Sequence, residues 1–162
     1  MKRFFYIILL SYLFGIMEVS AQKLILTPNG MCSSENLSIP YVEYMYKDGI
    51  SQKDLKNYCI QKLGQPDFFS YRVDYTDERN IKLSGFVKKS LKGIQFNLLL
   101  EFEQQSVRVS SQLLEKSGQN LDCKRYFTKK GKVKDWNFKT QVERRVDDII
   151  RSMMDMKIVV RQ

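Results

Sequence analysis

The stretch IKLSGFVKKSLKGIQFNLLLEFEQQSVRVSSQLL, residues 81–114, decides the fold of this chain because apolar and polar side chains alternate along it. A period of two is typical of β-strands that bury one face and expose the other. Together with the segment before it, the stretch predicts four consecutive strands joined by polar turns, over residues 71–76, 81–89, 94–103 and 106–114. Strands joined by turns this short pair antiparallel, so the four are expected to form a meander.

The alternation also predicts how these strands pair, because a shift by one residue would set apolar side chains opposite polar ones. In the first long hairpin the expected pairs are Val87 with Phe96, Leu83 with Leu100 and Ile81 with Phe102. In the next hairpin they are Phe102 with Val107 and Leu100 with Val109. The outer face would then align the charges of Lys82, Glu101 and Arg108 across three strands.

Outside the meander, the sequence predicts one more strand over 39–46 and two amphipathic helices. The first helix begins at Ser51 in a capping-box pattern and ends near Leu63. The second begins near Thr140, in another capping-box pattern, and runs to about Met156. The resulting order β-α-β-β-β-β-α predicts an α+β fold of two layers, an antiparallel sheet with two helices packed on one face.

The N-terminus predicts an export signal. Lys2 and Arg3 precede a charge-free apolar run over 4–16, and Val19-Ser20-Ala21 supplies the small residues that a signal peptidase recognises. The run is too short to span a bilayer as a helix, so we expect cleavage near Ala21 and a periplasmic or secreted protein without a transmembrane segment in the mature chain. The expected organisation is a signal peptide at 1–21, an irregular lead-in at 22–38, a single α+β domain at 39–156 with a basic irregular insert at 115–139, and a C-terminal tail at 157–162.

Positive charge is concentrated in residues 115–139, which hold eight basic and three acidic residues, a net of +5. An excess of this size suits an anionic partner, either an unknown envelope protein or an anionic lipid or glycan. Nucleic acid is not expected, because an exported protein rarely meets it. The candidate anion-binding residues are Lys124, Arg125, Lys129, Lys130, Lys132 and Lys134. The alternative is a solvated loop whose aromatic side chains pack on the edge of the domain.

Two apolar residues, Phe86 and Leu99, fall on the otherwise polar outer face of the predicted sheet. They are either isolated exposed side chains, which are common, or the centre of a patch that contacts a partner.

Reactive chemistry has few candidates in this sequence. Histidine is absent, which removes Ser-His-Asp and Cys-His nucleophile systems and every His-ligated metal site. The paired carboxylates, Glu101 with Glu103 and Asp147 with Asp148, are expected to be exposed beside basic neighbours. No catalytic, cofactor-binding or metal-binding residue is therefore predicted, and no cofactor.

The three cysteines of the mature chain allow three pairings, and the sequence does not choose among them. Cys59 is expected on the apolar face of the first helix as a small buried hydrophobe. Cys32 and Cys123 lie in polar segments and are the better candidates for a disulfide.

The order of these features resembles a known family. A signal ending in Ala21-Gln22, a strand, the segment GISQKDL at 49–55 that opens a helix, a β-meander and a closing amphipathic helix are together similar to an exported Gram-negative bacterial domain family of unknown function. The resemblance covers about residues 39–156 and implies a TATA-binding-protein-like fold, but it transfers no activity and no site residue. We expect a non-enzymatic exported binding or structural module of the bacterial cell envelope; the alternative is a hydrolase-like enzyme that uses carboxylates without histidine.

Overall fold

The computed structural model describes residues 22–46, 50–63, 71–86, 94–154 and 159–160; the predicted signal peptide at 1–21 lies outside the described residues. The strands are β1 Leu24–Thr27, β2 Gly30–Ser33, β3 Tyr41–Tyr46, β4 Tyr71–Thr76, β5 Asn80–Phe86, β6 Gln95–Phe102, β7 Ser106–Leu114 and β8 Val159–Val160. The helices are α2 Gln52–Leu63, the short 3₁₀ helix η1 Cys123–Tyr126, and α3 Trp136–Met153.

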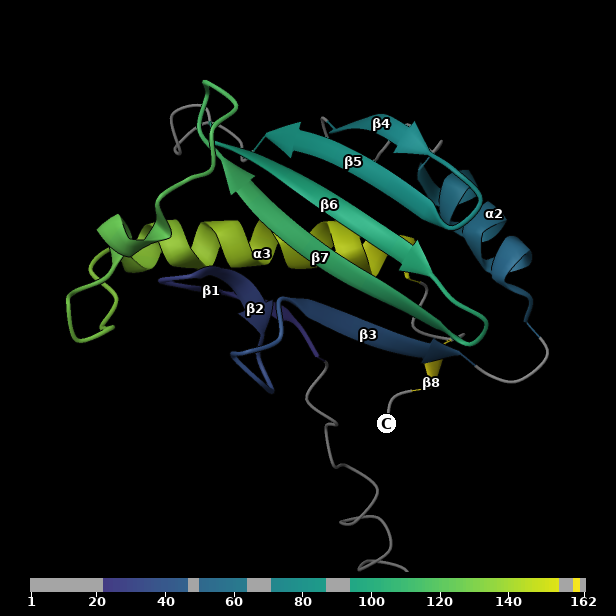
Figure 1. Cartoon of the computed structure of the whole chain (residues 1–162), viewed down its shortest axis with the longest axis horizontal. Coiled ribbons are helices and arrows are strands. Elements are labelled where there is room, and N and C mark those ends of the chain that lie inside the picture. Colours follow the sequence, from purple (N-terminus) through teal and green to yellow (C-terminus); the bar gives the residue numbers. More distant parts are fainter. Residues whose placement is uncertain (1–21, 47–49, 64–70, 87–93, 155–158, 161–162) are drawn as a thin grey trace, which may run out of the picture.

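An antiparallel sheet in the order β4-β5-β6-β7-β3-β8 forms one layer, and α2 and α3 pack behind it (Figure 1). Leu98 of β6, Leu55 of α2 and Val146 of α3 are all buried in the same hydrophobic cluster. The α+β prediction with its antiparallel meander is thus confirmed. The opposite, outer face of the sheet carries the polar side chains of the alternation, including Asn97, which pairs across with Gln112.

The pairing of the strands is confirmed in one hairpin and corrected in the other. β6 and β7 pair Phe102 with Val107, as predicted. β5 and β6, however, pair Gly85 with Phe96, a register shifted by two residues from the prediction. The reason is steric: the ring of Phe96 lies over Gly85, and a Cβ atom at position 85 would sit 2.5 Å from the ring carbon Cζ. A parity argument cannot detect a shift by two.

This register also corrects the predicted row of charges. Glu101 does lie opposite Arg108, but Lys82 lies opposite Leu99 rather than Glu101. Arg108 forms its ion pairs with Glu43 at 3.2 Å and Glu103 at 3.0 Å.

The predicted start of the first helix is confirmed. The Ser51 hydroxyl oxygen accepts a hydrogen bond from the Asp54 amide at 3.1 Å, and it donates one to the Asp54 carboxylate at 2.6 Å. The predicted start of the second helix near Thr140 is wrong, because Asp135 caps α3 one turn earlier by accepting from the Phe138 amide at 2.8 Å. That earlier start brings the Phe138 ring into the core, where it is buried.

The predicted irregular lead-in at 22–38 is also wrong. Its residues form the two-stranded sheet of β1 and β2, which turns at Pro28-Asn29 and is completed by Gly30 at φ 116°. Leu24 and Leu26 are buried on either side of the partly exposed Ile25, so this hairpin adds to the core. In the predicted C-terminal tail, Val159–Val160 form the short edge strand β8 beside β3. Among the described residues, no helix has the length and apolar character needed to cross a bilayer.

Candidate anion-binding site

The basic segment, residues 115–135, is folded onto the end of the domain that lies on the left in Figure 1. Its buried anchors are Leu121, Cys123 and Phe127. The Tyr126 ring stacks on Phe138 of α3 with the ring centres 3.7 Å apart. The insert predicted to be irregular over 115–139 contains η1, and its last four residues belong to α3. Of its aromatic residues, Tyr126, Phe127 and Phe138 pack on the domain edge, whereas Trp136 is exposed.

A tight turn inside the basic segment sets the direction of its lysines. The Thr128 amide donates to the Lys132 carbonyl at 2.7 Å, and the Gly131 amide donates back to the Thr128 carbonyl at 2.8 Å. Gly131 takes φ 77°, a left-handed conformation that glycine adopts without strain. The Lys134 amide then donates to the Tyr126 carbonyl at 2.9 Å. A hydrogen-bonded loop therefore carries Lys129, Lys130, Lys132 and Lys134.

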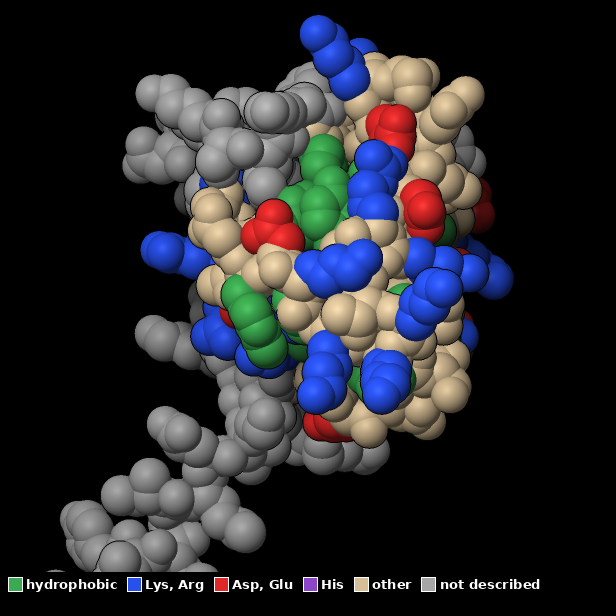
Figure 2. Space-filling model, turned by 90° about the vertical axis from the view of Figure 1, so that its left-hand side faces the viewer, with side chains coloured by type: hydrophobic (Ala, Val, Ile, Leu, Met, Phe, Trp, Pro, Cys, Tyr) green, Lys and Arg blue, Asp and Glu red, His purple; other side chains and the backbone are tan. Residues whose placement is uncertain are grey.

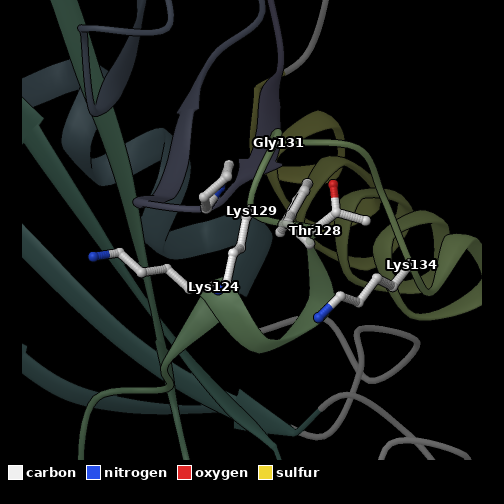
Figure 3. Close-up of a pocket in the computed structure, with 7 residues that line it drawn as sticks. Lys124, Thr128, Lys129, Gly131 and Lys134 are labelled. Atoms are coloured by element: carbon white, nitrogen blue, oxygen red, sulfur yellow. The ribbon is translucent and has the colours of Figure 1, made fainter.

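Three of the six predicted anion-binding residues line one cavity. The cavity has a volume of about 400 Å³ and is lined by Pro28, Lys124, Phe127, Thr128, Lys129, Gly131 and Lys134. We call it the lysine pocket. Figure 2 shows this end of the molecule, where Lys and Arg side chains outnumber acidic ones, and Figure 3 shows the lining residues. Lys124, Lys129 and Lys134 are exposed to solvent, and the lining contains no carboxylate.

The acidic residues of the basic segment are occupied elsewhere. Glu115 forms an ion pair with Arg125. The Asp122 carboxylate accepts from the Lys124 amide at 3.1 Å, and Asp135 caps α3. Within the described part of the chain, no ion pair is recorded for the three pocket lysines. Their positive charge is thus left largely uncompensated, which favours an anionic ligand.

The other three predicted residues lie outside the pocket. Arg125 forms an ion pair with Glu115, and its guanidinium lies 5.8 Å from the centre of the Tyr126 ring. Lys130 and Lys132 are exposed but do not line the cavity. Burial raises the pKa of the Tyr126 hydroxyl, so this side chain stays neutral beside the lysines at physiological pH.

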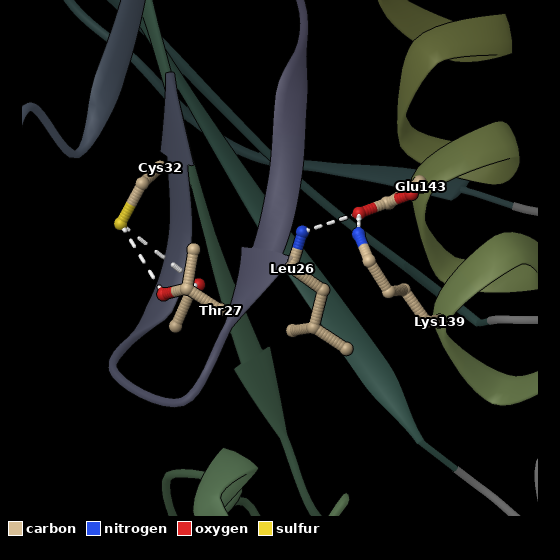
Figure 4. A network of polar contacts seen from close by, with 6 residues as sticks. Leu26, Thr27, Cys32, Lys139 and Glu143 are labelled. Atoms are coloured by element: carbon tan, nitrogen blue, oxygen red, sulfur yellow. Dashed lines mark hydrogen bonds and ion pairs between the residues drawn. The ribbon is translucent and has the colours of Figure 1, made fainter. Parts of the chain in front are cut away.

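No local sequence pattern indicates that Pro28 lines the pocket. The β1–β2 hairpin brings it there, and that hairpin is fastened to α3 by a polar contact (Figure 4). The Leu26 amide donates to the Glu143 carboxylate at 2.7 Å, and Lys139 pairs with the same carboxylate. The apolar wall of the pocket, Pro28 with Phe127, therefore depends on contacts between segments far apart in the sequence.

The predicted patch of Phe86 and Leu99 falls partly outside the described residues. Leu99 is half-buried on the outer face of β6, between Lys82 and Ser110. The backbone of Phe86 pairs with Gln95, and its side chain lies outside the described part of the chain.

Three of the four paired carboxylates, Glu103, Asp147 and Asp148, form ion pairs with arginines. Glu101 and Glu103 line a second, polar cavity of about 570 Å³ together with Arg79, but Glu103 is held by Arg108. On α3, Asp147 pairs with Arg151 at 2.7 Å and Asp148 with Arg144 at 3.8 Å. Among the described residues, no group of acidic and cysteine side chains is arranged to hold a metal ion.

The three cysteines are buried free thiols. Cys59 is in the core beneath α2, as predicted, and burial raises its pKa to about 12. The Cys32–Cys123 pairing expected from the sequence is not formed in this structure. The Cys32 sulfur lies 3.5 Å from the Thr27 hydroxyl, and the Cys123 thiol donates to the Leu121 carbonyl at 3.5 Å.

A scan against protein-family models finds no match, and a search of curated proteins finds no significant match either. Among solved structures, the chain is similar to a DUF4468 family protein from Bacteroides ovatus ATCC 8483, with a TM-score of 0.41 and 12% sequence identity over 69% of this chain and 81% of that chain. The DUF4468 family has no assigned function. At this level of similarity, the neighbour carries no argument about function or site residues.

Proposed function

We propose that the protein is a non-enzymatic binding module of the bacterial cell envelope, which holds an anionic group in the lysine pocket. The observation that carries the proposal is a cavity of about 400 Å³ whose lining includes three lysines and no carboxylate. Export through the predicted signal peptide, and a TATA-binding-protein-like version of the two-layer fold, are part of the same proposal. The two helices packed on one face of the sheet support the second of these.

The lining of the pocket indicates the chemistry of the ligand. Lysine ammonium groups act as point charges that bind phosphate, sulfate or carboxylate oxygens through charge-assisted hydrogen bonds. The Thr128 hydroxyl adds a neutral donor, and Pro28 with Phe127 adds an apolar wall. The pocket therefore suits an anionic group attached to a less polar part, as in a lipid headgroup or an acidic glycan.

A hydrolase-like enzyme is the weaker candidate. It would use Glu101 and Glu103 in the second cavity, where one carboxyl has to act as the acid and the other as the base. Glu103 forms an ion pair with Arg108 at 3.0 Å, and Glu101 is exposed. Neither carboxyl lies in the enclosed apolar surroundings that distinguish the acid from the base in such enzymes.

The test is isothermal titration of the purified chain with inorganic pyrophosphate at low salt. The pocket variant carries Lys124→Gln, Lys129→Gln and Lys134→Gln. The control carries Lys23→Gln, Lys53→Gln and Lys82→Gln, three exposed lysines outside the pocket, so both variants lose the same charge.

A hydrogen bond to a charged group contributes about 1.5–3 kcal/mol, so the pocket variant is expected to bind at least about tenfold more weakly than the control. Raising the salt concentration should weaken binding to the native chain as well. Equal affinities of the two variants would refute the pocket as the binding site.

A further inference from the structure

We propose that the end of the molecule formed by the basic segment and the first turn of α3 docks on a membrane that contains anionic lipids, with Trp136 inserted at the interface. This inference rests on the proposed function and names the partner of the same site. It needs no membrane-spanning helix, since the contact lies on the surface of the folded domain.

Trp136 is the feature that the anion pocket leaves unexplained. It is the single tryptophan of the chain and, at 66% exposure, the most exposed large hydrophobic side chain among the described residues. Its position is fixed by the fold, because Asp135 caps α3 and Phe138 is anchored in the core two residues later. The helix therefore holds the indole in solvent while its apolar neighbours are buried.

Several exposed lysines precede α3 in the sequence. The basic segment carries exposed amines at Lys116, Lys124, Lys129, Lys130, Lys132 and Lys134. Its carboxylates are engaged by Arg125 and by backbone amides, as described above. Figure 2 shows the positive character of this end of the molecule. Lysines near an anionic lipid surface each contribute about 1 kcal/mol, or about fivefold in affinity.

A bilayer surface can bind the exposed lysines and Trp136 together, and we therefore favour it over a soluble polyanion. The amines meet the lipid phosphates, while an indole prefers the boundary between headgroups and acyl chains. A soluble polyanion would satisfy the lysines and leave Trp136 in water. Of the three other exposed large apolar side chains among the described residues, Leu37 lies between β2 and β3, and Ile60 of α2 and Val73 of β4 lie on elements at the opposite end of the domain in Figure 1. None of the three belongs to the basic segment, so docking is expected through the end that carries Trp136.

The single tryptophan provides the assay, because its fluorescence reports on one position. The purified chain is mixed at low salt with vesicles of phosphatidylcholine alone or of phosphatidylcholine with an equal amount of phosphatidylglycerol. With the anionic vesicles, Trp136 emission is expected to move to shorter wavelength and to become protected from the neutral quencher acrylamide. Both changes should disappear at high salt and with phosphatidylcholine alone.

Cosedimentation with the same vesicles tests whether the pocket lysines and Trp136 contribute to membrane binding. Loss of the three pocket lysines in the Lys124→Gln, Lys129→Gln, Lys134→Gln variant is expected to weaken binding about one hundredfold relative to the Lys23→Gln, Lys53→Gln, Lys82→Gln control. Trp136→Ala should weaken binding more than Ile60→Ala, which removes an exposed apolar side chain at the other end. Far-ultraviolet circular dichroism checks that each variant is folded.

The outcomes separate the two proposals. Pyrophosphate binding without any vesicle binding would overturn the membrane proposal and leave the anion pocket standing. Vesicle binding with unchanged Trp136 emission and no effect of Trp136→Ala would overturn the docking through this end. Failure to bind either pyrophosphate or anionic vesicles would overturn both.

Discussion

Replacing Gly85 by alanine tests the packing that sets the register of β5 and β6. The new methyl carbon would lie 2.5 Å from Cζ of Phe96, so the ring has to move by about 0.9 Å to reach the 3.4 Å of an ordinary contact. Phe96 is 1% exposed and is enclosed by the core, so it cannot move freely. Overpacking of this kind costs about 1–3 kcal/mol in the free energy of unfolding. For a chain of this size, each kcal/mol lowers Tm by about 2–4 °C.

The assay is thermal and urea unfolding followed by circular dichroism, on Gly85→Ala, Phe96→Leu and the double variant. The shorter leucine leaves room for the methyl group, so the double variant is expected to be more stable than the sum of the two single effects, by about 0.5–3 kcal/mol. With the register expected from parity alone, Gly85 would face Leu98 and alanine would be harmless. A fully stable Gly85→Ala variant, or strictly additive effects, would therefore refute this packing.

Two further predictions concern the core. Glu143→Ala leaves the Leu26 amide without its acceptor and Lys139 without its partner, so the free energy of unfolding should fall by about 1–3 kcal/mol. Glu143→Gln keeps an oxygen acceptor and should lower it less. Faster hydrogen exchange of the Leu26 amide in the alanine variant would identify the lost contact. Burial raises the pKa of Cys59 from 9.0 to about 12 and that of Cys123 to about 11, so the folded state holds these protons more tightly than the unfolded state. The free energy of unfolding is then expected to fall as pH rises above about 9, and to fall less in the Cys59→Ala variant. The same pH dependence in the native chain and in this variant would contradict a raised pKa of Cys59.

The sheet was predictable from the sequence because its strands are long enough for the alternation to show. β6 and β7 have eight and nine residues, and their pairing was predicted correctly. The β1–β2 hairpin was missed because each of its strands has four residues, too few for a clear period. The start of α3 was missed for a different reason. Thr140 has a Glu three residues later and so forms a capping box, whereas Asp135, which caps α3 in the structure, has Phe138 at that position and forms none.

The candidate site was predictable only in its composition. Local charge density along the sequence distinguishes the basic segment, which contains Lys124, Lys129 and Lys134. Their arrangement around a cavity depends on the turn at Gly131 and on the packing of the β1–β2 hairpin beside η1. No local pattern at Pro28 or in the hairpin predicts the contact between Pro28 and the basic segment, because that contact joins segments about one hundred residues apart.

Nuclear magnetic resonance can show whether the lysine pocket binds an anionic group. Backbone amide shifts of the isotope-labelled chain would be followed while inorganic pyrophosphate is added at low salt. Saturable shifts are expected at Lys124, Thr128, Lys129 and Gly131, which line the pocket, and none at Lys82 on the outer face of β5. Shifts spread evenly over all exposed lysines, or absent from the pocket, would contradict binding in the pocket.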